Sequence, residues 1–429
     1  MRTVALTALL LAAVALAAQT SALKAQGTDE LRFTLILSRH GVRPPLTPNA
    51  ALDPRSSSPW PALEVPLGYL TPHGGLALNR MGAYMRLDLA KKGLLPAKGC
   101  LKSSQVYLYA DTDERNIMST FTTLEGLAPG CDPLPVNTIA LERGVRDPLF
   151  SPTSGTFPAP SSEAVEADRR ASMGSDAANY LTLSGNPELS ELAHILAPDH
   201  ARPPAKPILD EARPLAAASS LVEDLLLEYT DGKPANEVGW GHVDDAVLHR
   251  LMPLNIKAFG LVTRTPLAAR SEASNLVAHI LDTLEQAAET GAAAVPGAIG
   301  PAGTRLVYVS GHDSNLCGVG GLLGLHWTTG GLTDDTPPDS QIVFELWQNR
   351  KSKQFSVHLL YRAQSFEQLR MALPITLAHP PAEFVLTPPG CTAAEPCSFA
   401  VFDHAAHALL DPAYVKADLL PTESAKPTP

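Results

Sequence analysis

The chain has 429 residues, of which 45% are apolar and 18% are charged, and this composition is typical of a globular protein rather than a disordered one. Such a length allows a soluble protein with two domains and a substantial core. The formal net charge of −11 excludes a general nucleic-acid binder, because no basic excess is present to neutralise a phosphate backbone.

The first 25 residues are predicted to be a signal peptide. Arg2 precedes an apolar stretch, VALTALLLAAVALAA, and small residues follow it, with cleavage expected between Ala17 and Ala25. A transmembrane anchor is the alternative, but this run is shorter than the roughly 20 residues that span a bilayer. We therefore expect a periplasmic or secreted protein that has no membrane attachment in its mature form.

Short apolar runs bounded by polar or turn residues predict buried strands at 32–37, 105–111 and 305–311. Helical patterns are found at about 75–95, 113–127 and 314–325. Strands followed by helices predict an α/β fold with a mainly parallel sheet flanked by helices. Two alternating runs predict an antiparallel hairpin that closes one edge of the sheet, at 341–349 and 355–363.

The pattern changes between about residues 137 and 260, where Pro- and Ser-rich stretches alternate with helical runs and strand signals are weak. We interpret this segment as a mostly α-helical cap inserted into the α/β core, which then comprises residues 28–136 and 261–420. The polar tail, residues 421–429, is expected to be disordered.

The chain has five cysteines, and export to an oxidising compartment would allow them to pair. Cys391 and Cys397 can close a short loop, and Cys100 and Cys131 can bracket the segment between two elements. Cys317 is then left over in an apolar stretch, and we interpret it as a buried thiol that packs as a small hydrophobe. No CxxC pair is present, which disfavours a cysteine zinc site.

Charged and imidazole side chains follow the three predicted strands directly. They are Arg39, His40 and Arg43 after the first strand, Arg115 after the second, and His312 and Asp313 after the third. Because ligands bind outside the carboxyl ends of parallel strands, these residues should converge at one cleft. The cleft would be cationic although the protein is acidic.

Such a cleft suits a phosphate monoester, because each guanidinium can bind two phosphate oxygens and stabilise their charge in the transition state. His40 could attack phosphorus as a neutral imidazole, or could be a metal ligand or a general base. Neither HxH nor HExxH spacing accompanies it, and the arginines would repel a cation. We therefore expect no metal and no other cofactor.

A leaving oxygen needs a proton, and Asp313 is predicted to donate it and then to assist the attack of water on a phosphohistidine. This role predicts activity mainly in mildly acid solution, where a carboxyl with a raised pKa is still protonated. A helix N-cap is the alternative role for Asp313, although Ser314 or Asn315 could cap the helix instead.

The sequence RHGVRPP at 39–45 resembles the RHGxRxP signature of the histidine acid phosphatases, and GHDSN at 311–315 resembles the His-Asp motif of that family. The likeness continues through LTPHGG, ADTDER, GWG, TPP and the late PGC. It is greatest with the bacterial periplasmic branch that contains phytases and glucose-1-phosphatases. The resemblance implies a Rossmann-like domain with an inserted helical cap, and it also implies both cysteine pairings.

The resemblance also implies a role for each site residue: His40 as the phosphorylated nucleophile, Arg39 and Arg43 as a phosphate clamp, Arg115 as a third phosphate-binding arginine, His312 as a further phosphate ligand, and Asp313 as the proton donor. Arg115 could instead be a surface helix residue and His312 a satisfied core histidine. The sequence DERN departs from the Arg-Thr expected after Asp-Glu in the phytases, which leaves Arg115 the less certain of the two.

The substrate is expected to be a small-molecule phosphate monoester, with sugar phosphates and phytate as the candidates. Leu46 resembles the glucose-1-phosphatase pattern, whereas Glu223 aligns with an acidic residue of the phytases or is a solvated charge on a helix face. The protein is expected to be a monomer or a weak dimer.

Two rival functions remain open: a non-catalytic periplasmic protein that binds phosphate or a phospho-sugar, and a phosphomutase-like member of the superfamily. A binding protein needs neither a nucleophile nor an acid, so the presence of both His40 and Asp313 argues against it. The predicted signal peptide and the His-Asp pair argue against the phosphomutase. A helical cluster near the C-terminus, Asp403, His404 and His407, has spacing that could bind a metal, but a surface helix is the favoured interpretation.

Overall fold

The computed structural model describes residues 29–142, 144–174, 185–198, 202–289, 294–393 and 396–425. The predicted signal peptide lies outside these residues. Within the described ranges, no helix is both long enough and apolar enough to cross a membrane.

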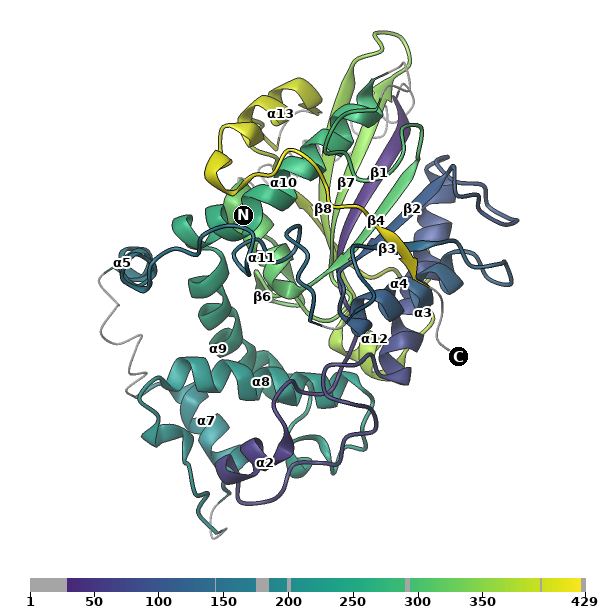
Figure 1. The fold of residues 1–429 in the computed structure, drawn as a ribbon. Helices are drawn as coiled ribbons and strands as arrows, with labels where there is room; N and C mark the ends of the chain where they lie inside the picture. Colours follow the sequence, from purple (N-terminus) through teal and green to yellow (C-terminus); the bar gives the residue numbers. More distant parts are fainter. Residues whose placement is uncertain are drawn as a thin grey trace, which may run out of the picture.

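The described residues form a nine-stranded sheet at the centre of the molecule, in the order β10-β8-β7-β1-β4-β2-β3-β11 with β9 also beside β8 (Figure 1). Four of its strands are parallel: β1 (Asp29–Arg39), β4 (Leu306–Gly311), β2 (Val106–Ala110) and β3 (Val136–Thr138). The antiparallel strands are β7 (Gln341–Asn349), β8 (Phe355–Ala363), β9 (Ala382–Leu386), β10 (Cys397–Ser398) and β11 (Glu423–Ala425). A separate two-stranded ribbon consists of β5 (Thr328–Thr329) and β6 (Leu332–Thr333).

Helices cover both faces of this sheet. One face packs against α10 (Pro266–Ala288) and α11 (Asp313–Leu323), and the other against α3 (Pro72–Lys91) and α4 (Glu114–Leu127). Alternate residues of β1 enter the two cores, Leu35 and Leu37 on the α10 side and Ile36 on the α3 side. A central parallel strand is therefore apolar on both faces, which is why its sequence reads as a continuous apolar run.

The α/β fold predicted from the sequence is confirmed, with the expected helices present as α3, α4 and α11 and the late hairpin present as β7 and β8. The prediction of a disordered tail is wrong for Glu423–Ala425. These residues form β11, whose backbone pairs with the edge strand β3. Pairing of this kind depends on a free strand edge, which the composition of the tail does not reveal.

A helical part lies beside the core (Figure 1) and contains α5 (Ser162–Met173), α7 (Pro187–Leu196), α8 (Pro214–Thr230) and α9 (Asp245–Thr263). Its buried apolar residues form a core of their own, to which the N-terminal segment adds Leu52 and Trp60. We propose that this part is the cap. The structure differs at both expected boundaries, since β3 is a sheet strand that runs past residue 136 and α9 runs past residue 260.

The remaining helices are short: α2 (Asn49–Leu52), η1 (Asp53–Arg55), η3 (Ile208–Asp210), η4 (Val238–Gly241), α12 (Phe366–Met371), α13 (Phe399–His407) and η5 (Pro412–Tyr414). In η4, Trp240 packs edge-on against Trp60 with ring centroids 5.2 Å apart, and its indole N–H donates to the Pro59 carbonyl. These contacts fasten the segment that follows β1 to the helical part.

The structure contains two disulfides, Cys100–Cys131 and Cys391–Cys397, in the pairings expected from the sequence. Cys317 is a buried free cysteine, and burial raises the pKa of its thiol to about 12. A thiol with so high a pKa is almost never a thiolate, so Cys317 is not suited to nucleophilic chemistry.

Candidate active site

The carboxyl ends of β1, β4 and β2 lie side by side. Arg39 is in register with Gly311, and Ala110 is in register with Ser310. Beyond these pairs, the backbone N–H of His40 donates to the Gly311 carbonyl at 3.0 Å. The three chain segments therefore leave the sheet together, and the structure brings all six of the predicted site residues to this edge.

The loop after β1 fits closely against α3, and glycines make this approach possible. A Cβ added to Gly41 would lie 2.5 Å from Leu78 Cδ1, and one added to Gly74 would lie 2.6 Å from the Val42 carbonyl oxygen. Both distances are far below van der Waals contact, so a side chain at Gly74 would require backbone movement, and one at Gly41 would require the Leu78 and Leu70 side chains to move. The close packing fixes the course of the chain on either side of His40.

The His40 imidazole is 2% exposed, and its Nδ1 lies 2.8 Å from the carbonyl oxygen of Gly41. A carbonyl oxygen can only accept, so Nδ1 carries the hydrogen and Nε2 of the neutral ring keeps its lone pair. Burial, reinforced by the charges of Arg115 and Arg39, holds the pKa of His40 well below its ordinary value. The lowered pKa favours the neutral form of the ring.

The two arginines of the clamp are joined by a carboxylate from the helical part. Glu223 Oε1 of α8 lies 2.6 Å from Arg39 Nη2 and 3.2 Å from Arg43 Nη2. On its other side, Arg39 Nη1 donates to the Thr336 carbonyl at 2.5 Å. Glu223 thus lies in the site rather than on a solvated helix face, and it lies where a bound phosphoryl oxygen would bridge the same two guanidinium groups.

Asp313 Oδ2 lies 2.8 Å from Arg39 Nη2. Burial alone would raise the pKa of this carboxyl, but the charges of Arg39, Arg43 and His312 outweigh burial and lower the pKa below its ordinary value. The expectation of a raised pKa is therefore wrong for the protein without substrate. The N-cap alternative also fails for Asp313, since its carboxylate contacts Arg39 and His312 precedes it at the cap position of α11.

Arg115 and His312 form the opposite side of the site. Arg115 Nη2 lies 2.7 Å from Asp113 Oδ2 and 3.4 Å from His312 Nδ1. The His312 ring stands edge-on to the His40 ring, with centroids 5.5 Å apart. Both alternatives from the sequence are therefore wrong, because Arg115 is not a surface arginine and His312 faces the site.

Asp111 completes this side, and the sequence reasoning missed it. Its carboxyl is 2% exposed, and Oδ2 lies 2.6 Å from His312 Nε2. The Nε2–H group of His312 donates to this carboxylate, so Nδ1 is the nitrogen that faces Arg115. The available signal was the position of Asp111, which directly follows a predicted strand beside the strand that leads to His312.

Replacing Asp111 with asparagine should weaken the hold on His312 and lower kcat/KM by about tenfold to a hundredfold, because a hydrogen bond to a charged group contributes ~1.5–3 kcal/mol. Inhibition by inorganic phosphate should weaken as well, since the His312 ring is no longer held with Nδ1 directed into the site. Steady-state kinetics with the exposed Asp210→Asn variant as control measures both effects. An unchanged phosphate inhibition constant beside a lower kcat would contradict a positioning role for Asp111.

One group of described residues has a spacing compatible with a metal ion, Asp111, Asp113 and His312, whose ligand atoms lie within 4.8 Å of one another. The guanidinium of Arg115 is already paired with Asp113, and its charge opposes the binding of a cation there. On α13, Asp403 Oδ1 and His407 Nδ1 lie 3.3 Å apart, a separation typical of an ion pair on a surface helix.

Comparison with known proteins gives a consistent result. A family model described as "Histidine phosphatase superfamily (branch 2)" matches residues 30–194 and 223–362. The chain is similar to phytase AppA of Escherichia coli, with 33% identity over 407 residues that cover 88% of this chain and 92% of that protein. It is also similar to the glucose-1-phosphatase of Salmonella typhimurium, with 32% identity over 393 residues, 86% of this chain and 91% of that protein.

Solved structures resemble the whole fold. The phytase of Hafnia alvei in complex with tartrate superposes with a TM-score of 0.80 at 29% identity, covering 91% of this chain and 99% of that one. The phytase of Citrobacter braakii superposes with a TM-score of 0.80 at 27% identity, covering 91% of this chain and 100% of that one.

Proposed function

We infer the function from the premise that the chain belongs to branch 2 of the histidine phosphatase superfamily. It is a hydrolase of the histidine acid phosphatase type, and it acts on phosphate monoesters. We propose the residue roles, the substrates and the location that follow. The observation that carries the roles is the buried His40 ring, which contacts the Gly41 carbonyl through Nδ1 and whose pKa is lowered by burial and by the charges of Arg115, Arg39 and Arg43.

In the proposed first step, the phosphoryl group enters the clamp of Arg39 and Arg43 and displaces the Glu223 carboxylate. Arg115 donates to the remaining phosphoryl oxygens, and His312 Nδ1 does so when the ring is an imidazolium, because its Nε2–H is already held by Asp111. His40 Nε2 then forms a bond to phosphorus while the bond between phosphorus and the ester oxygen breaks. Asp313 gives its proton to the leaving oxygen, so the product is an alcohol and not an alkoxide.

In the second step, water attacks the phosphohistidine and the N–P bond breaks. Asp313, now a carboxylate, takes a proton from this water, and inorganic phosphate leaves. The arginines stay charged throughout and stabilise the negative charge of both transition states.

Substrate binding would also prepare the acid. Arg39 and Arg43 lower the pKa of Asp313 in the free protein. A phosphoryl dianion in the clamp neutralises these charges, so the pKa of the buried carboxyl rises towards the value that burial alone would give it. The proton is therefore available when the ester is bound, which supports activity in mildly acid solution.

Sugar phosphates and phytate are both proposed as substrates, because the chain is similar to a glucose-1-phosphatase and to phytases. We also propose that the protein is exported to the periplasm or secreted, since two disulfides favour an oxidising compartment. A monomer or a weak dimer is the proposed state in solution.

An assay of phosphate release tests this function directly. Glucose 1-phosphate, phytate and p-nitrophenyl phosphate would be supplied in mildly acid solution, with and without a metal chelator. We expect release from at least one ester at a rate that the chelator leaves unchanged. Loss of activity with the chelator would favour a metal-dependent phosphatase, and binding of phosphate without release from any ester would favour a binding protein.

A further inference from the structure

The loop at 335–340, between β6 and β7, supports the segment that carries Arg39 and His40. The Thr336 carbonyl accepts from Arg39 Nη1 at 2.5 Å, and the Ser340 carbonyl accepts from the Arg39 backbone N–H at 2.9 Å. The backbone N–H of Asp339 donates to the His40 carbonyl at 3.1 Å. The positions of the clamp arginine and of the proposed nucleophile therefore depend on the course of this loop.

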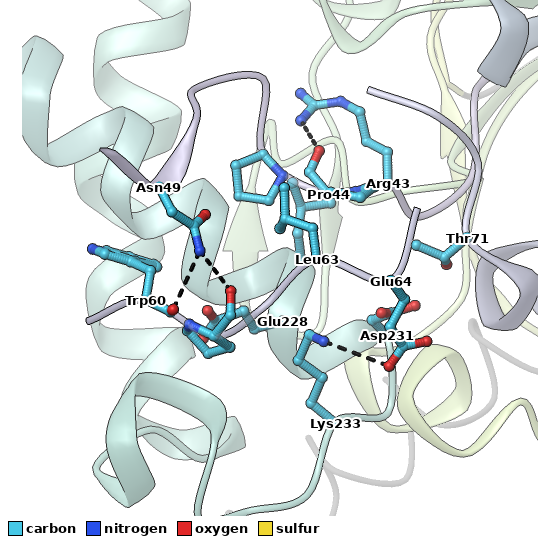
Figure 2. A pocket seen from close by; sticks show the side chains of 13 residues that line it. Arg43, Pro44, Asn49, Trp60, Leu63, Glu64, Thr71, Glu228, Asp231 and Lys233 are labelled. Atoms are coloured by element: carbon cyan, nitrogen blue, oxygen red, sulfur yellow. Dashed lines mark hydrogen bonds and ion pairs between the residues drawn. The ribbon is translucent and has the colours of Figure 1, made fainter. Parts of the chain in front are cut away.

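Helix α3 holds the same segment from another side. Gly41 packs closely against this helix, and the Val42 carbonyl accepts from the backbone N–H of Thr71 at 3.0 Å. Thr71 caps the first turn of α3, and together with Arg43 it lines a small pocket (Figure 2). The proposed nucleophile thus lies between two supports, this helix and the 335–340 loop.

The side chain of Asp339 joins these two supports through Gln364, the residue that follows β8. Gln364 Nε2 donates to Asp339 Oδ2 at 2.7 Å and to the Ala77 carbonyl of α3 at 3.2 Å. The amide cannot be reversed, because its oxygen would then face two acceptors. Asp339 also has a left-handed backbone, with φ 62°, which glycine adopts more readily. An aspartate at this position therefore has a conformational cost that its side-chain contacts must offset.

Asp339 and Gln364 each have one buried oxygen that lacks a donor. Asp339 is 0% exposed and Gln364 is 2% exposed. Within the part of the chain that the structure describes, neither Asp339 Oδ1 nor Gln364 Oε1 has a hydrogen-bond partner. A proton on Asp339 Oδ1 would supply the donor that the amide oxygen lacks. A carboxylic acid and the amide would then be linked by two hydrogen bonds, whereas a carboxylate would leave both oxygens unpaired.

The cation that acts on Asp339 is Arg362 of β8, and it is already shared between two other carboxylates. Arg362 Nη2 lies 2.9 Å from Asp88 Oδ2 and 2.8 Å from Glu383 Oε1. Tyr308 of β4 also interacts with Asp339, but burial raises the pKa of its hydroxyl, which stays neutral. Burial likewise raises the pKa of Asp339 well above its ordinary value, and the opposing effects of two amides and of Arg362 are smaller.

We propose that Asp339 is a neutral carboxylic acid in the folded protein and a positioning residue, which joins the 335–340 loop to Gln364 and α3 and thereby fixes His40 for attack on phosphorus. The positioning role rests on the proposed function, in which His40 is the nucleophile. The protonated state of Asp339 can be measured without any substrate.

Unfolding in denaturant at several pH values tests the protonated state. A carboxyl whose folded pKa is raised keeps its proton in the folded chain but loses it in the unfolded chain above about pH 3.9, so stability is greatest below this pH and declines as the pH rises towards the folded pKa. The unfolding equilibrium constant of the wild type, divided by that of Asp339→Asn, should therefore rise about tenfold for each pH unit between about pH 4.5 and 6. The same ratio taken with the exposed Asp210→Asn variant should stay constant. A constant or falling ratio for Asp339→Asn would overturn the proposal.

Turnover of p-nitrophenyl phosphate tests the positioning role. Asparagine can make both contacts of the protonated acid, so Asp339→Asn should keep kcat within about threefold of the wild type. Asp339→Gly suits the left-handed backbone but lacks the side chain, and its kcat should fall by about tenfold to a hundredfold, because a small displacement of a reacting group is costly. Its phosphate inhibition constant should change by less than about threefold, since Glu223 and Asp313 still hold the clamp.

Two results would overturn the positioning role. One is a kcat for Asp339→Gly equal to that of the wild type, and the other is a loss in Asp339→Asn as large as the loss in Asp339→Gly. A wild type that cleaves no ester would instead overturn the proposed function, and the pH dependence of unfolding would still decide whether Asp339 is protonated.

Discussion

Replacement of His40 by alanine should lower kcat/KM for every phosphate ester by at least about ten thousandfold, because removal of a nucleophile from a hydrolase removes the covalent route altogether. The clamp would still bind phosphate, since Arg39, Arg43 and Arg115 are unchanged. Initial-rate assays would measure turnover, and inhibitor titration or calorimetry would measure phosphate binding. Loss of turnover with retained binding would separate a chemical defect from misfolding.

The pH dependence of the wild type adds a second test of His40. The pKa of this imidazole lies well below its ordinary value, so the ring should remain unprotonated as the pH falls from neutral into the mildly acid range. Turnover should therefore show no loss around the ordinary histidine pKa of about 6.5 that could be assigned to His40. If kcat/KM falls at that pH and the fall disappears when another histidine is replaced, the titration belongs to that histidine and not to His40.

Trapping of the intermediate makes the test of His40 specific. The wild type, mixed with labelled substrate and quenched in alkali, should carry label on histidine, and the His40→Ala protein should carry none. The exposed His379→Ala variant is the control and should retain both label and turnover. Label that persists after the His40 replacement would place the nucleophile elsewhere.

The convergence of the site could be predicted from the sequence because it follows from sheet geometry. Arg39, Arg115 and His312 each follow an apolar run, and parallel strands bring such positions to one edge. The strands themselves could be predicted because a strand buried on both faces is apolar throughout. Local patterns therefore sufficed for the α/β core and for most of the site.

Contacts between the core and the helical part could not be predicted in this way. Glu223 is 184 residues from Arg39 in the chain, and its place in the clamp depends on how α8 packs. The lowered pKa of Asp313 likewise depends on its 2.8 Å distance to an arginine from another strand. Neither composition nor periodicity contains these distances, so the expectation of a raised pKa for Asp313 could not take the nearby arginine charges into account.

Asp313→Asn is expected to affect substrates unequally, because only some leaving groups need a proton. For glucose 1-phosphate, whose leaving alcohol is a weak acid, kcat should fall by about a hundredfold to ten thousandfold, the usual contribution of general acid catalysis. p-Nitrophenyl phosphate leaves as a stable anion, so phosphorylation of His40 should slow by less than about tenfold. Rapid-mixing experiments would then show a burst of p-nitrophenol, since hydrolysis of the phosphohistidine still lacks its base.

The same substitution should tighten the binding of inorganic phosphate. Asp313 competes for Arg39 at 2.8 Å, and its lowered pKa keeps it ionised through the mildly acid range. Asparagine carries no charge, so the phosphate dianion meets a more positive clamp and its inhibition constant should fall. The exposed Asp210→Asn variant should change neither constant. A proton donor must discriminate between leaving groups by their acidity. An equal loss of kcat on both esters, with no burst and an unchanged phosphate inhibition constant, would therefore show that Asp313 supports the fold of the site and does not transfer a proton.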